Sequence, residues 1–189
     1  AKGSRPWPEY DPEKARFLIK QAKAEGAEVV LMANDSFPYM QQTGELLQAM
    51  WTEVGLKVKF DIYSQAVLLQ KAREGDFHAN SEAGSYRFDP DGFYSRQILS
   101  TAPSTKESSR FKNDKADKLI LEARGTASKA KRLELYGEIN SIVNEELPVL
   151  FVHHLTLLEA GAKNLMGYQP AFSGPFSTRG AGIRTAWLA

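Results

Sequence analysis

Strand-like and helix-like hydrophobic patterns alternate along the first half of this chain, and this alternation constrains the fold more than any other feature. AEVVLMAND (27–35) is an apolar run typical of a buried strand, and LKVKFDIY (56–63) alternates apolar and polar residues like a half-buried strand. A helix is predicted between them from about Pro38 to Gly55, with an apolar stripe of Leu47, Met50, Trp51 and Val54. Strands that alternate with helices predict a layered α/β domain.

Capping residues and apolar periods predict the remaining elements. Asp11 and Pro12 favour the start of a helix that Gly26 ends, and Ser64 can cap a short helix through Arg73. DFHANSEAG is a weaker strand candidate, and VLFVHHLTLLEA is predicted as a strand pair or one long strand. DKADKLILEAR and SKAKRLELYGEINSIVNEEL are predicted helices; Pro148 ends the second, whose apolar side holds Leu133, Tyr136, Val143 and Leu147.

Composition narrows the function classes. The 189 residues are 42% hydrophobic, enough for one domain or slightly more with a real core. A formal net charge of +1 implies no nucleic-acid or membrane-surface field, so no nucleic acid is expected as a partner. The absence of cysteine excludes disulfides, thiolate metal sites and a cysteine nucleophile. The N-terminal residues lack the apolar core of a signal peptide, and no apolar run reaches the roughly 20 residues of a membrane helix.

The stretch SYRFDPDGFYSRQ (85–97) carries the strongest hint of a site. Asp89 and Asp91 could act as acid and base in a hydrolase, as paired carboxylates do in glycoside hydrolysis. However, Asp-Pro-Asp-Gly is ordinary turn composition, which favours a turn at the rim of a binding cleft. Arg87 could bind a ligand carboxylate or stack on a ring; an internal salt bridge to one of the two aspartates is the alternative.

The remaining candidate motifs are weaker. His153 and His154 would point to opposite faces of a strand, so a histidine metal site is not expected. One of them could face a cleft, although one buried and one solvated histidine is the favoured interpretation. Residues 179–182 lack the pattern of a phosphate loop, and no cofactor is expected. The basic start of the long helix, with Lys129, Lys131 and Arg132, is predicted to be a solvated face.

The ordered set of segments resembles the C-terminal lobe of family 5 extracellular solute-binding proteins, the peptide/nickel-type receptors of ABC importers. The resemblance covers nearly the whole chain, and no single piece is decisive. The segments that carry it are YDPEKARFLIKQA, LLQAMWTEVGLKVKFDIY, GDFHANSEAGSYRFDPDGFYS, SSRFKNDKADKLILEAR and KRLELYGEINSIVNEELPVLFV.

The resemblance implies a fold and a domain arrangement. The fold would be α/β, the second lobe of a two-lobed, type II-like periplasmic-binding-protein fold, with a mixed sheet flanked by helices. Residues 1–167 would form the ligand-binding lobe, and residues 168–189 a return segment that packs on a first lobe missing from this chain. The protein would be a non-enzymatic periplasmic or extracytoplasmic receptor, with a membrane anchor at an absent N-terminus as one option. Its partners would be a small solute, an ABC permease and the N-terminal lobe.

The resemblance also implies that the 85–97 stretch is a cleft wall that holds ligand without chemistry. In the peptide-binding branch, an aspartate three residues before the Asp-Pro-Asp segment pairs with the ligand's amino group; Tyr86 stands there, which disfavours simple peptides. Another branch carries W-S-G-R-x-D-P-D-G-N, whose arginine Arg87 matches, while Gly84 replaces its tryptophan. A ligand with a carboxylate or an aromatic ring is therefore expected. The candidate ligand-binding residues are Ser85, Tyr86, Arg87, Phe88, Asp89, Asp91, Tyr94 and His153.

Two rival functions remain at this point. One is a small α/β hydrolase that uses Asp89 and Asp91. The other is a helical interaction module, which would expose an apolar helix face to its partner, whereas a lobe would bury those faces.

Overall fold

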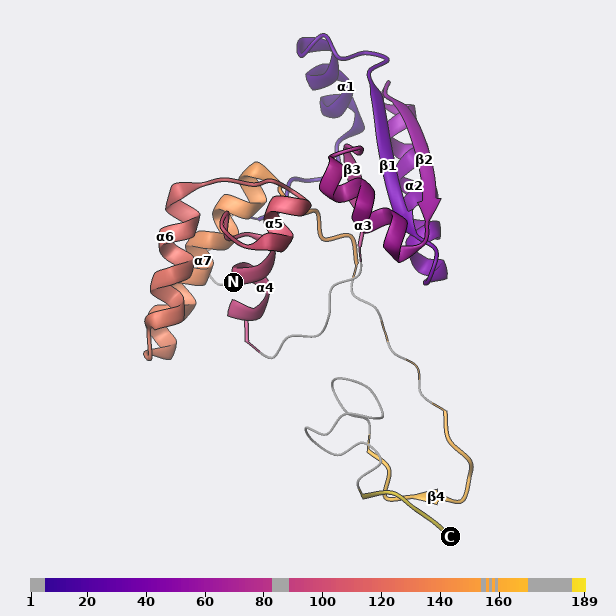
Figure 1. Ribbon diagram of the computed structural model, residues 1–189, viewed down its shortest axis with the longest axis vertical. Coiled ribbons are helices and arrows are strands. Elements are labelled where there is room, and N and C mark those ends of the chain that lie inside the picture. The colour runs from indigo at the N-terminus through magenta and orange to yellow at the C-terminus, as the bar shows by residue number, and fades with distance from the viewer. Residues whose placement is uncertain (1–5, 83–88, 154–155, 157, 159, 170–184) are drawn as a thin grey trace. The chain divides into compact units, whose positions relative to one another are not determined.

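Two compact units make up the chain, Ala1–Val149 and Leu150–Ala189, and each is described by itself. The computed structural model describes residues 6–82, 89–153, 156, 158, 160–169 and 185–189 (Figure 1).

A parallel three-stranded sheet forms the first part of the larger unit. β1 (Glu28–Asn34) lies between β2 (Lys57–Tyr63) and β3 (Ala79–Ser81), and both neighbours run parallel to it. Because β1 is central, Leu31, Met32 and Ala33 are at most 1% exposed, as expected for a strand covered on both faces. The α/β fold class is confirmed, but where a mixed sheet was expected, the sheet of this unit's described residues is parallel.

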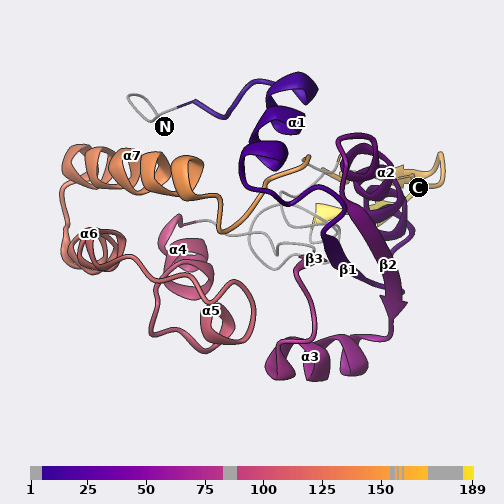
Figure 2. The same cartoon turned by 90° about the horizontal axis from the view of Figure 1, so that it is seen from above.

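Helices cover the two faces of this sheet. α2 (Pro38–Glu53) lies on one face and α3 (Gln65–Glu74) on the other (Figure 2). A Cβ on Gly44 of α2 would lie 2.2 Å from the Phe60 ring of β2, so the helix packs unusually close to the strand there. Each crossover connects parallel strands through one helix, which is the arrangement that the alternating pattern predicts.

The first helix, α1 (Pro12–Gln21), begins as predicted and ends earlier than predicted. The Asp11 carboxylate accepts a hydrogen bond from the Lys14 amide at 2.9 Å, which confirms the cap. The helix ends at Gln21 rather than near Gly26, because Lys23 already adopts a positive φ of 55°. No residue of α1 is fully buried.

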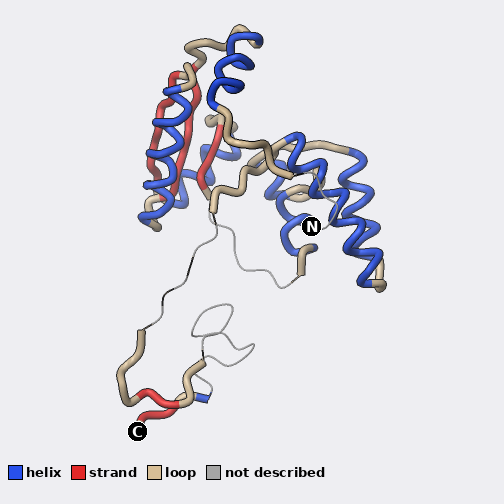
Figure 3. Tube along the Cα trace, turned by 180° about the vertical axis from the view of Figure 1, so that it is seen from behind, coloured by secondary structure: helices blue, strands red, loops and turns tan. Residues whose placement is uncertain are grey.

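Four helices form the second part of the larger unit (Figure 3): α4 (Asp91–Gln97), α5 (Pro103–Glu107), α6 (Asp114–Gly125) and α7 (Lys129–Glu146). The predicted apolar side of α7 is half right. Tyr136 and Val143 are buried, but Leu133 is 56% exposed, and Leu147 lies beyond the helix at a positive φ of 50°. The face that packs against α4 and α6 is shifted; its largest members are Leu135, Tyr136, Ile139 and Val143.

The smaller unit contains little regular structure among its described residues. β4 (Leu165–Met166) pairs antiparallel with β5 (Trp187–Leu188). The strand predicted for residues 149–160 is wrong for the residues described there: Leu150, Phe151 and Val152 are about half exposed and pair with no described strand. In the described parts of both units, no helix combines the length and apolar character needed to cross a membrane.

Candidate functional site

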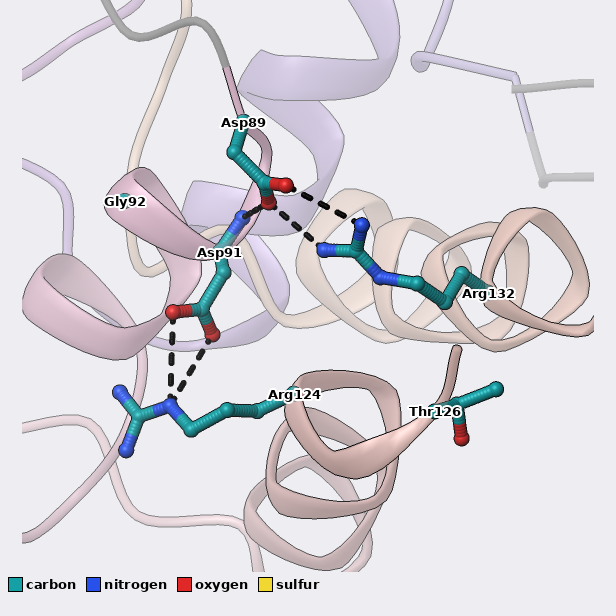
Figure 4. A pocket seen from close by; sticks show the side chains of 6 residues that line it. All are labelled: Asp89, Asp91, Gly92, Arg124, Thr126 and Arg132. Atoms are coloured by element: carbon teal, nitrogen blue, oxygen red, sulfur yellow. Dashed lines mark hydrogen bonds and ion pairs between the residues drawn. The ribbon is translucent and has the colours of Figure 1, made fainter. Parts of the chain in front are cut away.

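The Asp-Pro-Asp segment begins helix α4 instead of forming an isolated turn (Figure 4). The Asp89 carboxylate accepts a hydrogen bond from the Asp91 amide at 2.9 Å, and the Asp89 carbonyl accepts one from the Gly92 amide at 3.1 Å. A side-chain oxygen that satisfies a free amide at a helix start is a capping interaction. The turn composition seen in the sequence therefore marks a helix N-terminus.

Asp89 also forms a bidentate ion pair with Arg132 on α7. The two guanidinium nitrogens Nη2 and Nη1 donate to Oδ1 and Oδ2 of Asp89 at 2.7 and 3.1 Å. Such a fork-to-fork pair fixes both the distance and the orientation of the two groups. It connects the start of α4 to a helix 43 residues further along the chain.

Asp91 has a different and looser partner, Arg124 on α6. Nε of Arg124 lies 3.4 Å from each oxygen of the Asp91 carboxylate, which also accepts a hydrogen bond from the Ser95 hydroxyl. The two aspartates thus point to two different arginines, as Figure 4 shows. The sequence expectation of a solvated basic face is wrong for Arg132, because that side chain is only 27% exposed and paired.

Arg132 is itself held from several sides. Its Nε donates to the carbonyl of Ala123 at 3.1 Å, its Nη2 donates to the Tyr136 hydroxyl at 3.1 Å, and its guanidinium lies 5.4 Å from the centre of the Tyr136 ring. Tyr136 stacks on Tyr94, with ring centres 5.2 Å apart, and the Tyr94 hydroxyl donates to the Asn140 side chain. The ion pair is therefore joined directly to the helical core.

The charges of the site follow from these contacts. The hydrogen bonds from Arg132 and from the Asp91 amide lower the pKa of Asp89, and the bond to Asp89 raises the pKa of Arg132. Burial raises the pKa of Tyr94 to about 12, so its phenol stays protonated near neutral pH. A carboxylate with a lowered pKa that is shared with a guanidinium is a poor proton donor. The geometry holds charge in place and does not suit acid catalysis.

A pocket of about 290 Å³ lies beside these groups. It is lined by Asp89, Asp91, Gly92, Arg124, Thr126 and Arg132. Both charge signs line it, and the dashed contacts in Figure 4 show that they neutralise each other. In the described part of the chain, no group of three or more histidine, aspartate or glutamate side chains could hold a metal.

Polar groups also gather at the carboxyl edge of the sheet, which sequence reasoning did not single out. Asn34 ends β1 and is 3% exposed. Its side-chain nitrogen Nδ2 donates a hydrogen bond to Oε1 of Gln65, and its side-chain oxygen Oδ1 accepts one from the Ser36 amide at 2.6 Å. Glu82 directly follows β3. Burial of its carboxyl group raises the pKa of Glu82, and the positive charge of Arg96 partly opposes this shift. The residue as a whole is exposed. The sequence could have indicated this group of polar residues, because the carboxyl ends of parallel strands meet at one edge of a sheet.

The predicted site residues are thus distributed over several places. Ser85, Tyr86, Arg87 and Phe88 lie outside the described residues, as does the suggested salt bridge of Arg87. Asp89 and Asp91 lie together at the start of α4, and Tyr94 is 8% exposed within the helical core, where it supports α4 from inside. His153 is an exposed residue of the smaller unit. The structure adds Arg124 and Arg132 to this set of candidate site residues.

Comparison with known proteins identifies the family to which this chain is similar. Residues 1–133 match the model of a family described as bacterial extracellular solute-binding proteins, family 5 middle. The dipeptide-binding protein of Escherichia coli K12 is 32% identical over 168 residues, which are 84% of this chain and 31% of that protein. Heme-binding protein A of Haemophilus influenzae is 30% identical over 165 residues, 84% of this chain and 30% of that protein.

A solved structure agrees with these relatives. An ABC transporter-associated periplasmic binding protein from Helicobacter pylori, in complex with a peptide, superposes with a TM-score of 0.63 and 25% identity over 74% of this chain and 28% of that one. The chain spans about a third of the length of the curated relatives that it matches. Because the family model covers well over half of its residues, this chain belongs to the bacterial extracellular solute-binding proteins of family 5.

Proposed function

We propose that this chain is the ligand-binding lobe of an extracytoplasmic receptor that delivers peptides to an ABC importer. The observation that carries the proposal is the arrangement of the residues on either side of 83–88. β3 ends at Ser81, and Arg132 and the start of α4 hold Asp89 in place. Ligands of open α/β sheets bind at the carboxyl ends of the strands, which supports a ligand site near the carboxyl end of β3.

Binding without chemistry is the activity that this arrangement supports. Asp89 and Asp91 would be the acid and the base of a hydrolase, but each is paired with an arginine, and the pKa of Asp89 is lowered. The relatives named above are binding proteins. We therefore favour a receptor over the small hydrolase, and we expect Asp89→Asn to alter affinity without affecting any turnover.

The receptor would work by closure of two lobes over the solute. Hinge closure lets each lobe supply part of the contacts, and the closed form would then dock on the permease. The lobe described here would supply the wall formed by residues 83–91, and the smaller unit, with its return segment 168–189, would pack on the other lobe. A lone lobe makes only part of the contacts, so we expect it to bind ligand with millimolar affinity.

The names of the relatives favour a peptide as ligand, in place of the sequence-based preference against simple peptides. The E. coli relative is named for dipeptides, and the H. pylori protein was solved with a peptide. Tyr86 stands in place of the family's ammonium-binding acid, and a neutral phenol cannot neutralise an ammonium. The receptor would therefore not require a peptide with a free amino terminus. Arg87 would instead bind a carboxylate of the peptide.

Haem is the second candidate ligand. The expected combination of Arg87 with Tyr86 and Phe88 suits an aromatic molecule that bears carboxylates, and one relative is named for haem. A peptide and haem both carry a carboxylate. The two ligands differ mainly in the groups that the rest of the cleft would contact.

Nuclear magnetic resonance titration of the ¹⁵N-labelled chain tests the proposal at the weak affinity expected of one lobe. Trialanine and its N-acetylated form should both shift the amide signals of Asn34, Ser81 and Asp91, whereas maltotriose should not. Hemin is tested separately through its absorbance band. If neither peptide shifts these signals at millimolar concentration while hemin binds, haem replaces peptide as the ligand. If no ligand binds at these residues, the receptor proposal is wrong.

A further inference from the structure

We propose that Arg110 is a positioning residue that holds the helical cluster, α4 to α7, against the C-terminal end of α3 and so fixes its orientation to the parallel sheet. Arg110 lies between α5 and α6, whereas α3 follows β2 in the sheet part. α3 and α5 lie side by side (Figure 1 and Figure 2). The contact would keep Asn34 at the sheet edge and Asp89 at the start of α4 at one separation. The inference does not depend on the proposed function, and its test uses no ligand.

The first argument is the fit between the Arg110 guanidinium and the end of α3. Nη2 of Arg110 donates to the carbonyl oxygen of Ala72 at 3.4 Å. A Cβ on Gly75, the residue that caps α3, would lie 2.5 Å from both Nη1 and Nη2, so the guanidinium fills the space that a side chain would take there. A cation at a helix C-terminus meets the last carbonyl groups and the negative end of the helix dipole. The guanidinium and its place are therefore complementary in shape and in charge.

The second argument comes from the backbone of Arg110, which has a positive φ of 52°. Its amide donates to the carbonyl of Thr105 at 2.7 Å and closes the end of α5. Glycine adopts such a φ at no steric cost, whereas any larger residue needs other contacts to offset the strain. The contacts of the Arg110 side chain that the structure describes are those with α3. The side chain thus has a role at a position where the turn alone would favour glycine.

The third argument is the contrast with a neighbouring ion pair between the same two helices. Nε of Arg73, on α3, lies 3.4 Å from Oε1 of Glu107, on α5, and the two side chains are 62% and 42% exposed. Exposed pairs of this kind contribute little to stability, because two flexible side chains must be ordered in water. Arg110 as a whole is also exposed, but its guanidinium lies against backbone atoms of α3. We therefore expect Arg110 to fix the orientation more than Arg73 does.

Pulsed electron paramagnetic resonance, which measures the distance between two nitroxide spin labels, tests the inference on the full 189-residue chain. The chain has no cysteine, so labels attach only at cysteines that are introduced. Ala49→Cys on α2 and Ala130→Cys on α7 replace exposed alanines and span the two parts. This pair should give one narrow distance distribution. Arg110→Gly should broaden it several-fold, because glycine keeps the positive φ and removes the guanidinium.

Controls separate the contact with α3 from a change in the backbone or in the cluster. Lys23→Gly makes the same replacement at another exposed residue with a positive φ, 55°, and should leave the distribution unchanged. Labels at Lys106→Cys on α5 and Ala130→Cys on α7 span the cluster alone, and their distribution should stay narrow in Arg110→Gly. Arg73→Gln should broaden the distribution between the two parts less than Arg110→Gly does.

Three results would overturn the inference. If the distribution between the two parts is unchanged in Arg110→Gly, the parts are joined without this side chain. If the distribution within the cluster broadens as well, Arg110 acts by closing α5 and not by holding α3. A distribution that is already broad with Arg110 in place would show that no fixed orientation exists. Arg110→Lys, which keeps the charge but loses the planar group that lies on Gly75, should give an intermediate width.

Discussion

The parallel sheet and the helical cluster of the larger unit are stabilised in different ways. In the sheet, complete burial is concentrated in the central strand β1, and β2 retains exposed side chains such as that of Ile62. In the cluster, α4, α6 and α7 share one apolar core in which Ile98, Ile120 and Ile139 are fully buried. The fully buried side chains of the sheet thus belong to one strand, whereas those of the cluster come from several helices.

This difference indicates how the two parts could divide the work of binding. The sheet ends in polar residues at its carboxyl edge, among them Asn34 and Glu82, where a ligand of an α/β protein would bind. The cluster presents Arg132 on a well-packed helix, and this arginine holds Asp89. One part would offer binding groups, and the other holds Asp89 in place.

The largest expected effect comes from the core of the cluster. Ile139→Ala removes a fully buried side chain from α7 and should lower the free energy of unfolding by about 2–5 kcal/mol, because it leaves a cavity. Leu133→Ala, on the exposed side of the same helix, should change it by no more than about 0.5 kcal/mol. Urea unfolding followed by circular dichroism measures both. Equal losses would mean that the packed face of α7 has been assigned wrongly.

The sheet should respond to volume added at the contact between α2 and β2. Gly44→Ala places a methyl group 2.2 Å from the Phe60 ring and should destabilise by about 1–3 kcal/mol, since the ring or the helix must move. Gly125→Ala, in α6, meets no atom within 4 Å and should be neutral or stabilise by up to about 1 kcal/mol. The same urea experiment compares them. A neutral Gly44→Ala would show that α2 is not packed tightly on β2.

The sequence predicted the elements well wherever local physics decides them. The Asp11 cap, β1, β2 and the helix that begins at Pro38 follow from hydrophobic period and capping chemistry. The cap of the helix that begins at Gln65 was only partly right, because Ser64 precedes it but makes no side-chain capping bond. Leu133 was misplaced because the apolar residues of α7, among them Leu133 and Leu135, allow more than one apolar stripe. Only packing against α4 and α6 chooses between these stripes.

The site was harder to predict because its partners are far apart in sequence. Nothing local to Asp89 indicates that an arginine 43 residues away binds it, so Arg132 could be read only as part of a charged surface. The sequence singled out the Asp-Pro-Asp segment as a turn at the rim of a cleft, and its role at a helix start was missed. Aspartate favours turns and helix N-termini for the same reason, a side-chain oxygen that accepts a backbone hydrogen bond.

The smallest expected effect is a pH dependence that compares one carboxylate from each part. Asp89 in the cluster pairs with Arg132, and Asp76 after the sheet helix α3 pairs with Lys71; these hydrogen bonds lower both pKa values. A folded-state pKa below the unfolded value favours the ionised form in the folded state. The resulting stability is therefore fully present above the unfolded pKa of about 3.9 and is lost as pH falls through the folded pKa.

Asp89→Asn and Asp76→Asn should each destabilise the chain slightly near pH 7, and this difference from the wild type should shrink as the pH approaches about 3. Added salt should reduce it further, because both carboxylates are more than half exposed. Urea unfolding at several pH values measures the difference. If the Asp89→Asn difference stayed constant down to acid pH, its ion pair would contribute nothing to stability.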